Sequence, residues 1–323
     1  LGAAALLLEG GVLAGVTAGL VAAALVAGAV VLSHVQNDRE AAVAVAWMGC
    51  GYAAAAGLLL GSPDQTVGPV SDWFGLPVAT AGAGALLAGL VSLVGLGEGR
   101  TLAIPPVVVG AVFASSGLVM RAEAFDPAVV LTTTLVLVVI AGSVFPWLAL
   151  GATGTSVAQL YSTADITADP VEVDPARVAA DARTAHDILV AVSATVGLLL
   201  VLVAPLSVSL GLAGTLLAVV GCLVVMLRTR QYRTGAEVLV GLVSGIAGLA
   251  AVAVSLVWLH PAWRPTTAVV LAVAGALLLV ATLVPGSPSV RRGRLGDLAE
   301  SVGLLALLPL LVVATGIFTA IRG

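Results

Sequence analysis

Long apolar runs separated by short polar segments recur along the whole chain. A helix that crosses a bilayer needs about 20 mostly apolar residues, and ten segments meet this requirement. They are residues 12–33, 41–60, 77–97, 102–120, 128–150, 188–204, 206–227, 238–259, 266–284 and 302–321. The pattern predicts an all-α fold, a polytopic transmembrane helical bundle with about ten complete spans.

The remaining segments divide the chain into four parts. Residues 1–8 (LGAAALLL) are apolar but too short to cross a membrane alone, and Glu9-Gly10-Gly11 is typical of a turn. We therefore expect residues 1–11 to hold the end of a preceding span and an external turn. Five spans follow in residues 12–152, a polar cytoplasmic segment in 153–187, and five further spans in 188–323.

Composition supports lipid as the solvent of this protein. Hydrophobic residue types make up 60% of the chain and charged types 9%, with a mean hydropathy of +1.17, whereas soluble domains carry about 25% charged residues. The net charge of −4 argues against nucleic acid as a partner. Cys50 and Cys222 both lie in apolar runs, and we interpret them as small buried apolar residues rather than a disulfide.

The arginines predict the orientation in the membrane, because cytoplasmic loops are enriched in positive charge. Alternate loops form two sets. The first set holds Arg39, Arg100, Arg177, Arg183, Arg228, Arg230, Arg233, Arg291, Arg292 and Arg294. The second set holds only Arg121, Arg264 and Arg322. The first set is therefore expected to be cytoplasmic, which places the C-terminus on the external side of the membrane.

The segment before the sixth span is rich in acidic residues. The Asp174-Pro175 pair is typical of a helix N-cap followed by proline at the first helical position. We predict one long helix from Pro175 to about Ala204, whose first turns protrude into the cytoplasm. This charged helix is either a docking surface or simply a solvated face. Within the spans, small residues such as Gly57 with Gly61 and Gly241 with Gly245 have the spacing of close helix packing.

Catalytic and transport machinery is not evident in the sequence. The ten apolar spans contain no ionisable residue well inside them, since Glu9, His34, Asp187, Glu237 and His260 all lie at span ends. A bundle interior without charge offers no carrier for proton or sodium coupling. There is also no P-loop, no HExxH pair and no zinc spacing of cysteine and histidine. We therefore expect a protein that is not an enzyme and has no catalytic, cofactor-binding or metal-binding residue.

Three stretches carry a resemblance to a known family. They are PARVAADARTAHDILVAVSA at 175–194, LRTRQYRTGAEVLVGLVSG at 227–245 and SVRRGRLGDLAESVGLLALLPLLVVATGIFTAIRG at 289–323. With the span pattern, they resemble EccD, the polytopic membrane subunit of the actinobacterial type VII (ESX) secretion system. That family has a cytoplasmic ubiquitin-like domain, eleven spans and an external C-terminus, and the present sequence departs from it by lacking the ubiquitin-like domain.

The resemblance implies a scaffold role. EccD subunits pair as a dimer around a lipid-filled cavity and assemble with the EccB, EccC and EccE subunits, and the EccC ATPase supplies the energy. Carried onto this sequence, the candidate partner contacts on the cytoplasmic side are Asp174, Arg177, Asp181, Arg183, Asp187, Arg228, Arg230, Arg233, Arg291, Arg292 and Arg294. Each of them could equally be a topology determinant or a solvated residue. Neutralising Arg228, Arg230 and Arg233 together is expected to weaken assembly.

Two other functions stay open at the level of the sequence. A secondary transporter or permease for a neutral or apolar solute would need a polar cavity at mid-membrane, which Ser115, Ser116, Thr132 and Thr133 could line. A lipid-modifying enzyme would need clustered polar catalysts at one membrane face, and the sequence shows none. A scaffold should purify within a large particle that contains an ATPase, whereas a permease should purify alone and move a solute.

Overall fold

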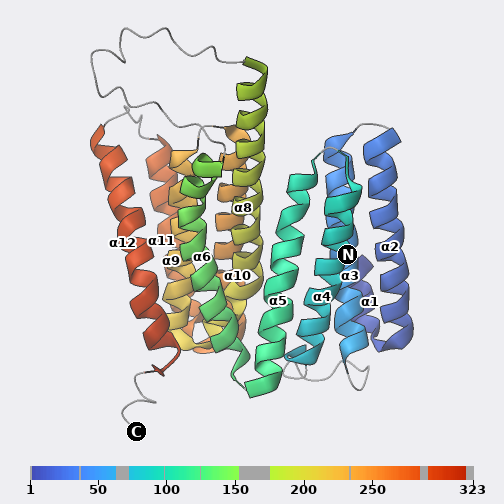
Figure 1. Ribbon diagram of the computed structural model, residues 1–323. Helices are drawn as coiled ribbons and strands as arrows, with labels where there is room; N and C mark the ends of the chain where they lie inside the picture. Colours follow the sequence, from blue (N-terminus) through green and yellow to red (C-terminus); the bar gives the residue numbers. More distant parts are fainter. Residues whose placement is uncertain are drawn as a thin grey trace.

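The computed structural model describes residues 2–35, 38–62, 73–97, 99–123, 125–152, 175–232, 234–283 and 290–317. Throughout these residues the regular structure is helical, with most helices running side by side along one axis (Figure 1). The α-helices are α1 (Gly2–Glu9), α2 (Gly11–Val35), α3 (Arg39–Gly61), α4 (Leu76–Gly95), α5 (Ile104–Glu123), α6 (Pro127–Ala152), α8 (Pro175–Ser209), α9 (Gly211–Arg228), α10 (Gly235–Leu259), α11 (Arg264–Leu283) and α12 (Val290–Ala314). Three short 3₁₀ helices accompany them: η2 (Arg100–Ala103), η3 (Thr229–Gln231) and η4 (Pro261–Trp263).

The predicted all-α, polytopic fold is confirmed. Each of the ten predicted spans corresponds to one helix, α2 to α6 and α8 to α12. Within the described residues, eight helices are long and apolar enough to cross a membrane, and α6 adds a shorter apolar segment at Pro127–Ser143. The predicted number of spans is therefore an approximation. At the start of the chain, α1 packs against α3 and α2, and the chain turns where Gly10 and Gly11 have φ values of 69° and 86°.

Helix α8 is longer than the sequence predicts. It begins at Pro175, as predicted, but continues through Pro205 to Ser209, and the chain then turns at Gly211 with a φ of 79°. The predicted end near Ala204 lies just before Pro205, and proline usually breaks a helix in water. Membrane helices tolerate an internal proline, since neighbouring groups satisfy the freed backbone carbonyl. Figure 1 shows the first turns of α8 extending beyond the ends of the neighbouring helices.

Helix α12 also differs from the prediction, and here the difference affects the site. The sequence analysis began the last span at residue 302, whereas the helix begins at Val290 and ends at Ala314. The charge of the stretch before 302 favours a loop, but arginine is a good helix former and the helix propagates through this stretch. Arg291, Arg294 and Glu300 are consequently helical residues.

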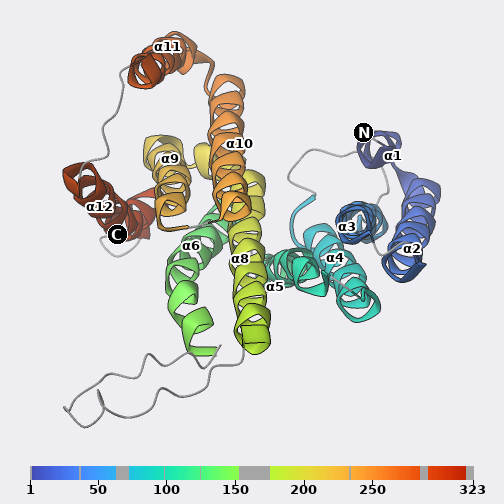
Figure 2. The same cartoon turned by 90° about the horizontal axis from the view of Figure 1, so that it is seen from above.

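The helices form two groups that meet at α5. In Figures 1 and 2, α1 to α5 lie on one side, and α6 with α8 to α12 lie on the other. Helix α8 is central in the second group and packs against α6, α9, α10 and α5. The largest buried cluster lies here, with Leu131, Leu199, Leu200 and Leu217 almost completely enclosed. Val109 and Met120 of α5 belong to the same cluster, which joins the two groups.

Helix α11 lies at the edge of the second group, where it packs on α10 and η4 (Figure 2). Large apolar side chains such as Val269, Leu277 and Leu283 are exposed along it. In a helix surrounded by lipid, exposed leucine and valine are the expected surface, because lipid chains are as apolar as leucine.

Glycine allows close backbone contact between neighbouring helices. A Cβ on Gly110 of α5 would meet the backbone N of Leu86 and O of Gly82 in α4, and a Cβ on Gly117 would meet the backbone N of Ala79. The predicted packing role of Gly57 is confirmed: a Cβ there would meet the backbone of Thr80. The Thr80 hydroxyl donates a hydrogen bond of 2.7 Å to the Gly57 carbonyl. Small residues thus bring α3, α4 and α5 into direct contact.

Candidate functional site at the arginine-rich end

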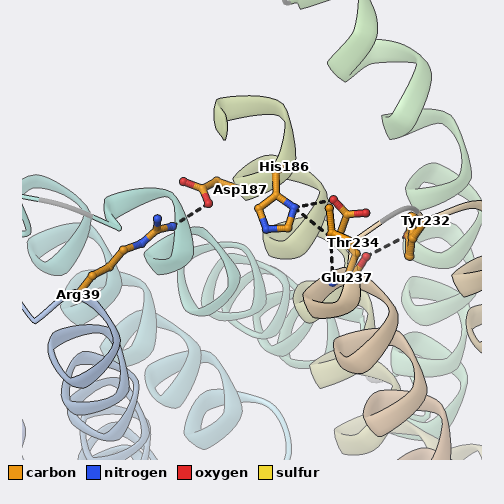
Figure 3. A network of polar contacts seen from close by, with 7 residues as sticks. Arg39, His186, Asp187, Tyr232, Thr234 and Glu237 are labelled. Atoms are coloured by element: carbon orange, nitrogen blue, oxygen red, sulfur yellow. Dashed lines mark hydrogen bonds and ion pairs between the residues drawn. The ribbon is translucent and has the colours of Figure 1, made fainter. Parts of the chain in front are cut away.

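The ends of the bundle differ in charge. One end, which we call the arginine-rich end, is where α3, η2, α10 and α12 begin, where α9 ends, and where α8 passes His186. Arg39, Arg100, Arg228 and Arg230 lie there, whereas Arg121 and Arg264 lie at the opposite end. Three ion pairs between different helices of the described residues lie at the arginine-rich end, and Figure 3 shows those of Asp187 and His186.

Two adjacent residues of α8 face two different groups of helices. Asp187 points toward Arg39 and His186 toward α10 (Figure 3). The Asp187 Oδ1 atom accepts a hydrogen bond of 2.7 Å from Arg39 Nη2, and its Oδ2 atom accepts one of 3.3 Å from the Thr101 hydroxyl. Because Arg39 begins α3 and Thr101 lies in η2, Asp187 connects the first helix group to the second.

His186 binds the first turn of α10. Its Nδ1 atom lies 2.7 Å from Glu237 Oε1 and 3.2 Å from the Thr234 hydroxyl. Thr234 is the N-cap of α10, and its hydroxyl accepts a hydrogen bond from the Glu237 backbone N–H. Glu237 is buried, so its carboxylate depends on the imidazole and on the positive end of the α10 dipole. Beside this pair, the Ser193 and Tyr232 hydroxyls lie 2.9 Å apart.

A third ion pair, between Arg228 and Glu300, is buried between α9 and α12. The two residues are only 6% and 7% exposed, and Arg228 Nε lies 3.6 Å from Glu300 Oε1. The Gln231 side chain donates a hydrogen bond of 2.8 Å to Glu300 Oε2. The expectation of a bundle interior without charge is therefore wrong at this end. The predicted spans leave Glu300 before the last span and Arg228 in a loop, so the apolar pattern does not reveal this pair.

Arg230 completes the contact between the end of α9 and the start of α12. Its Nη2 atom donates a hydrogen bond of 3.0 Å to the Gly293 carbonyl. A Cβ on Gly296 would fall on the Arg230 guanidinium, so any other residue there would displace this flexible side chain. The end of α9 and η3 thus contact α12 at two places, around Gly293 and at Glu300. These contacts determine the rotation of α12 relative to α9.

The structure divides the predicted partner contacts into three sets. Asp187, Arg228 and Arg230 bind groups of this same chain. Arg183, Arg291 and Arg294 are exposed. The others lie outside the described residues, in whole or by their side chains: Asp174, Arg177, Asp181, Arg233 and Arg292. Arg230 is exposed as well, so the described members of the predicted surface that a partner can reach are Arg183, Arg230, Arg291 and Arg294.

Two of the hydroxyls considered for a transport cavity, those of Ser115 and Thr132, bind groups of the bundle itself. Thr132 and Ser207 are both buried, with their hydroxyl oxygens 3.0 Å apart. The Ser115 hydroxyl donates to the Val112 carbonyl of its own helix. A groove of about 900 Å³ between α2, α3 and α4 is lined mainly by small apolar residues such as Ala22, Ala53 and Ala83. Across the described residues, no group of three histidine, cysteine or acidic side chains is placed to hold a metal ion.

The Asp187 contact leads to a first prediction. We expect Asp187→Asn to change global stability by about 1 kcal/mol or less, because a partly exposed pair of this kind contributes little. The local effect should be larger, since Arg39 and Thr101 both lose their charged partner. Hydrogen exchange should therefore become faster in the first turn of α3 and in η2. Glu40→Gln, the removal of an exposed neighbouring carboxylate, is the control, and equal exchange in both variants would contradict the connecting role.

The family described as the EccD-like transmembrane domain matches residues 1–323, which is the whole chain. Among solved structures, protomer 1 of the ESX-3 core complex is similar, with a TM-score of 0.72 and 18% sequence identity over 99% of this chain and 73% of that chain. At this identity the likeness shows the fold. No curated protein sequence matches the chain.

Proposed function

Because the chain belongs to the family of EccD-like transmembrane domains, we propose that it is a non-catalytic scaffold of a type VII (ESX) secretion complex. The family and the fold support the broader conclusion that the protein is a multi-pass membrane component of such a complex. One observation supports the more specific proposal that it is a scaffold. The ion pairs at the arginine-rich end each join two helices of this chain, so their charges serve to position helices.

The proposed assembly follows from the family resemblance. Two copies pair around a lipid-filled cavity in the bacterial inner membrane, and the pair binds the EccB, EccC and EccE subunits. The EccC ATPase supplies the energy. The arginine-rich end faces the cytoplasm, in agreement with the preference of positive charge for that side, and the C-terminus faces outside.

The first turns of α8 are the proposed docking surface for cytoplasmic parts of the partners. This helix extends beyond its neighbours (Figure 1), and Arg183 is exposed on it. Asp174, Arg177 and Asp181 belong to the same proposed surface. Asp187 is excluded from it, because this residue binds Arg39 and Thr101.

Charge reversal on α8 tests the proposal. We expect the double variant Asp181→Arg with Arg183→Glu to lower the recovery of the ATPase subunit with the tagged full-length protein by several-fold. The reason is that reversing charges on a docking surface opposes the complementary potential of the partner. Arg121→Glu, at the opposite end, is the control. Full recovery of a particle of normal size from the α8 variant would contradict the docking role.

A permease for a neutral solute is the alternative function, and a liposome assay separates it from the scaffold. If the protein is a scaffold, we expect the isolated full-length protein to take up no solute into liposomes. We also expect it to purify in a large particle when its partners are present. The buried Thr132–Ser207 pair supports the scaffold, because those hydroxyls bind each other rather than a solute. Uptake by the isolated protein would favour the permease.

Neutralising Arg228, Arg230 and Arg233 together is expected to weaken assembly, but two of these arginines also hold helices of this chain in place. Arg228 is buried against Glu300, and Arg230 binds the Gly293 carbonyl. A loss of assembly from the triple neutralisation would therefore arise from altered packing of α12 as well as from any lost partner contact. The exposed residues of α8 give the cleaner test.

A further inference from the structure

The first turns of α12 have an outward face that combines two arginines with two leucines. Arg291, Arg294, Leu295 and Leu298 follow the i, i+3, i+4, i+7 spacing and therefore share one side of the helix. All four are exposed, and the two leucines are 64% and 60% exposed. This outward face is distinct from the side of α12 that contacts α9.

The contacts on the other side of α12 determine which residues face outward. Gly293 accepts a hydrogen bond from Arg230, Gly296 lies against the Arg230 guanidinium, and Glu300 is buried against Arg228. Farther along the same inner side, Leu307 and Leu311 are buried. The rotation of the helix is thus fixed by several polar contacts, and the arginine and leucine face points away from the bundle.

The outward face continues as an apolar stripe toward the other end of the helix. Val302 and Leu305 are exposed on the same side, one and two turns beyond Leu298. Exposed apolar side chains over several turns of a spanning helix face lipid tails. The two arginines stand at the end of this stripe, so their guanidinium groups lie at the depth where the tails meet the phosphate headgroups.

The charge at this position favours an anion. Arg291 and Arg294 are one turn apart on the outward face, whereas the Arg230 guanidinium binds the Gly293 carbonyl on the inner side. Asp297 is exposed on the flank of the same turn and is the acid nearest the two arginines in the described part of α12. Arginine binds phosphate through two parallel N–H groups, which gives geometric preference as well as charge.

We propose that Arg291 and Arg294 bind the phosphate of an anionic phospholipid, whose acyl chains lie along Leu295, Leu298 and Leu305. The lipid is favoured over an acidic protein segment because the arginines continue directly into an exposed apolar stripe. A water-soluble acidic segment would leave these leucines uncovered, whereas a phospholipid matches both the charged and the apolar part. The bound lipid would cover the side of α12 opposite to α9.

The test compares two double neutralisations in the full-length protein. The variant Arg291→Gln with Arg294→Gln removes the proposed site, and Arg121→Gln with Arg264→Gln removes the same charge at the opposite end. Each protein is placed in nanodiscs of phosphatidylcholine with a small fraction of phosphatidylglycerol, and the lipid that remains after mild detergent extraction is measured by native mass spectrometry. Circular dichroism and thermal unfolding show that both variants are folded.

The expected result is a loss of preference for phosphatidylglycerol in the Arg291 and Arg294 variant alone. Each arginine near a membrane surface changes the affinity for anionic lipid roughly fivefold, so the two together should change it about 25-fold. An equal loss in the control, or no preference in the parent protein, would overturn the proposal. Photo-crosslinking from position 298 in the assembled complex should label lipid, and labelling of a protein subunit would also overturn it.

Discussion

Glu300→Leu is expected to destabilise the protein more than any other single change at the arginine-rich end. Arg228 is only 6% exposed, so removing its partner leaves a buried guanidinium without a neutralising charge. Gln231 loses the acceptor of its 2.8 Å hydrogen bond at the same time. Breaking one side of a buried pair costs about 3–5 kcal/mol. The measurement is the free energy of unfolding in mixed micelles, followed by circular dichroism.

The double variant Arg228→Met with Glu300→Leu is the decisive control. It removes both charges and keeps apolar volume between α9 and α12, so it should recover most of the stability, since apolar replacement of a buried pair is often neutral or stabilising. Leu295→Ala, on the exposed side of α12, should have little effect in comparison. If Glu300→Leu and the double variant were equally unstable, the cost would come from packing rather than from the unpaired charge.

Gly110→Ala is the second change with a large expected effect. Alanine is about 1 kcal/mol better than glycine in a helix interior, so an open site would gain stability. At Gly110 the added Cβ meets the backbone of Leu86 and Gly82, and backbone atoms cannot move aside as a flexible side chain can. We expect α4 and α5 to separate and the protein to lose about 1–3 kcal/mol, as is typical of overpacking.

A matched control exists on another helix. A Cβ on Gly275 of α11 would meet no atom within 4 Å, so Gly275→Ala should leave stability unchanged or raise it. The two substitutions are chemically identical, and only the distance between neighbouring helices distinguishes them. A shift of the unfolding midpoint in the same direction for both variants would contradict the proposed backbone contact of α4 with α5.

Much of the helical organisation could be predicted from the sequence. The apolar runs located ten helices, because a span must satisfy its backbone hydrogen bonds internally and bury roughly 20 apolar residues in lipid. The start of α8 at Pro175 followed from local chemistry, since Asp174-Pro175 is a strong start signal. The burial of Cys50 and Cys222 followed from their apolar surroundings.

The helix ends were less predictable, and the candidate site depends on them. The predicted spans stop before Pro205 and begin after the charged residues that precede 302, yet the structure has both inside helices. Local sequence signals indicate which backbone conformation a residue prefers in water. Contacts with neighbouring helices can keep the same residue helical in the folded protein. The pairing of Arg228 with Glu300 joins positions 72 residues apart (300 − 228), and no local pattern specifies such a partner.

The sequence alone therefore determined that the protein is a polytopic helical bundle with unequal charge at its two ends. These properties depend on local apolar content and on residue type, which lipid and water select directly. Only the tertiary structure decided which arginines face outward and which are buried, and which glycines are required. Those outcomes depend on the rotation and separation of packed helices, and these arise from contacts between residues that are distant in the chain.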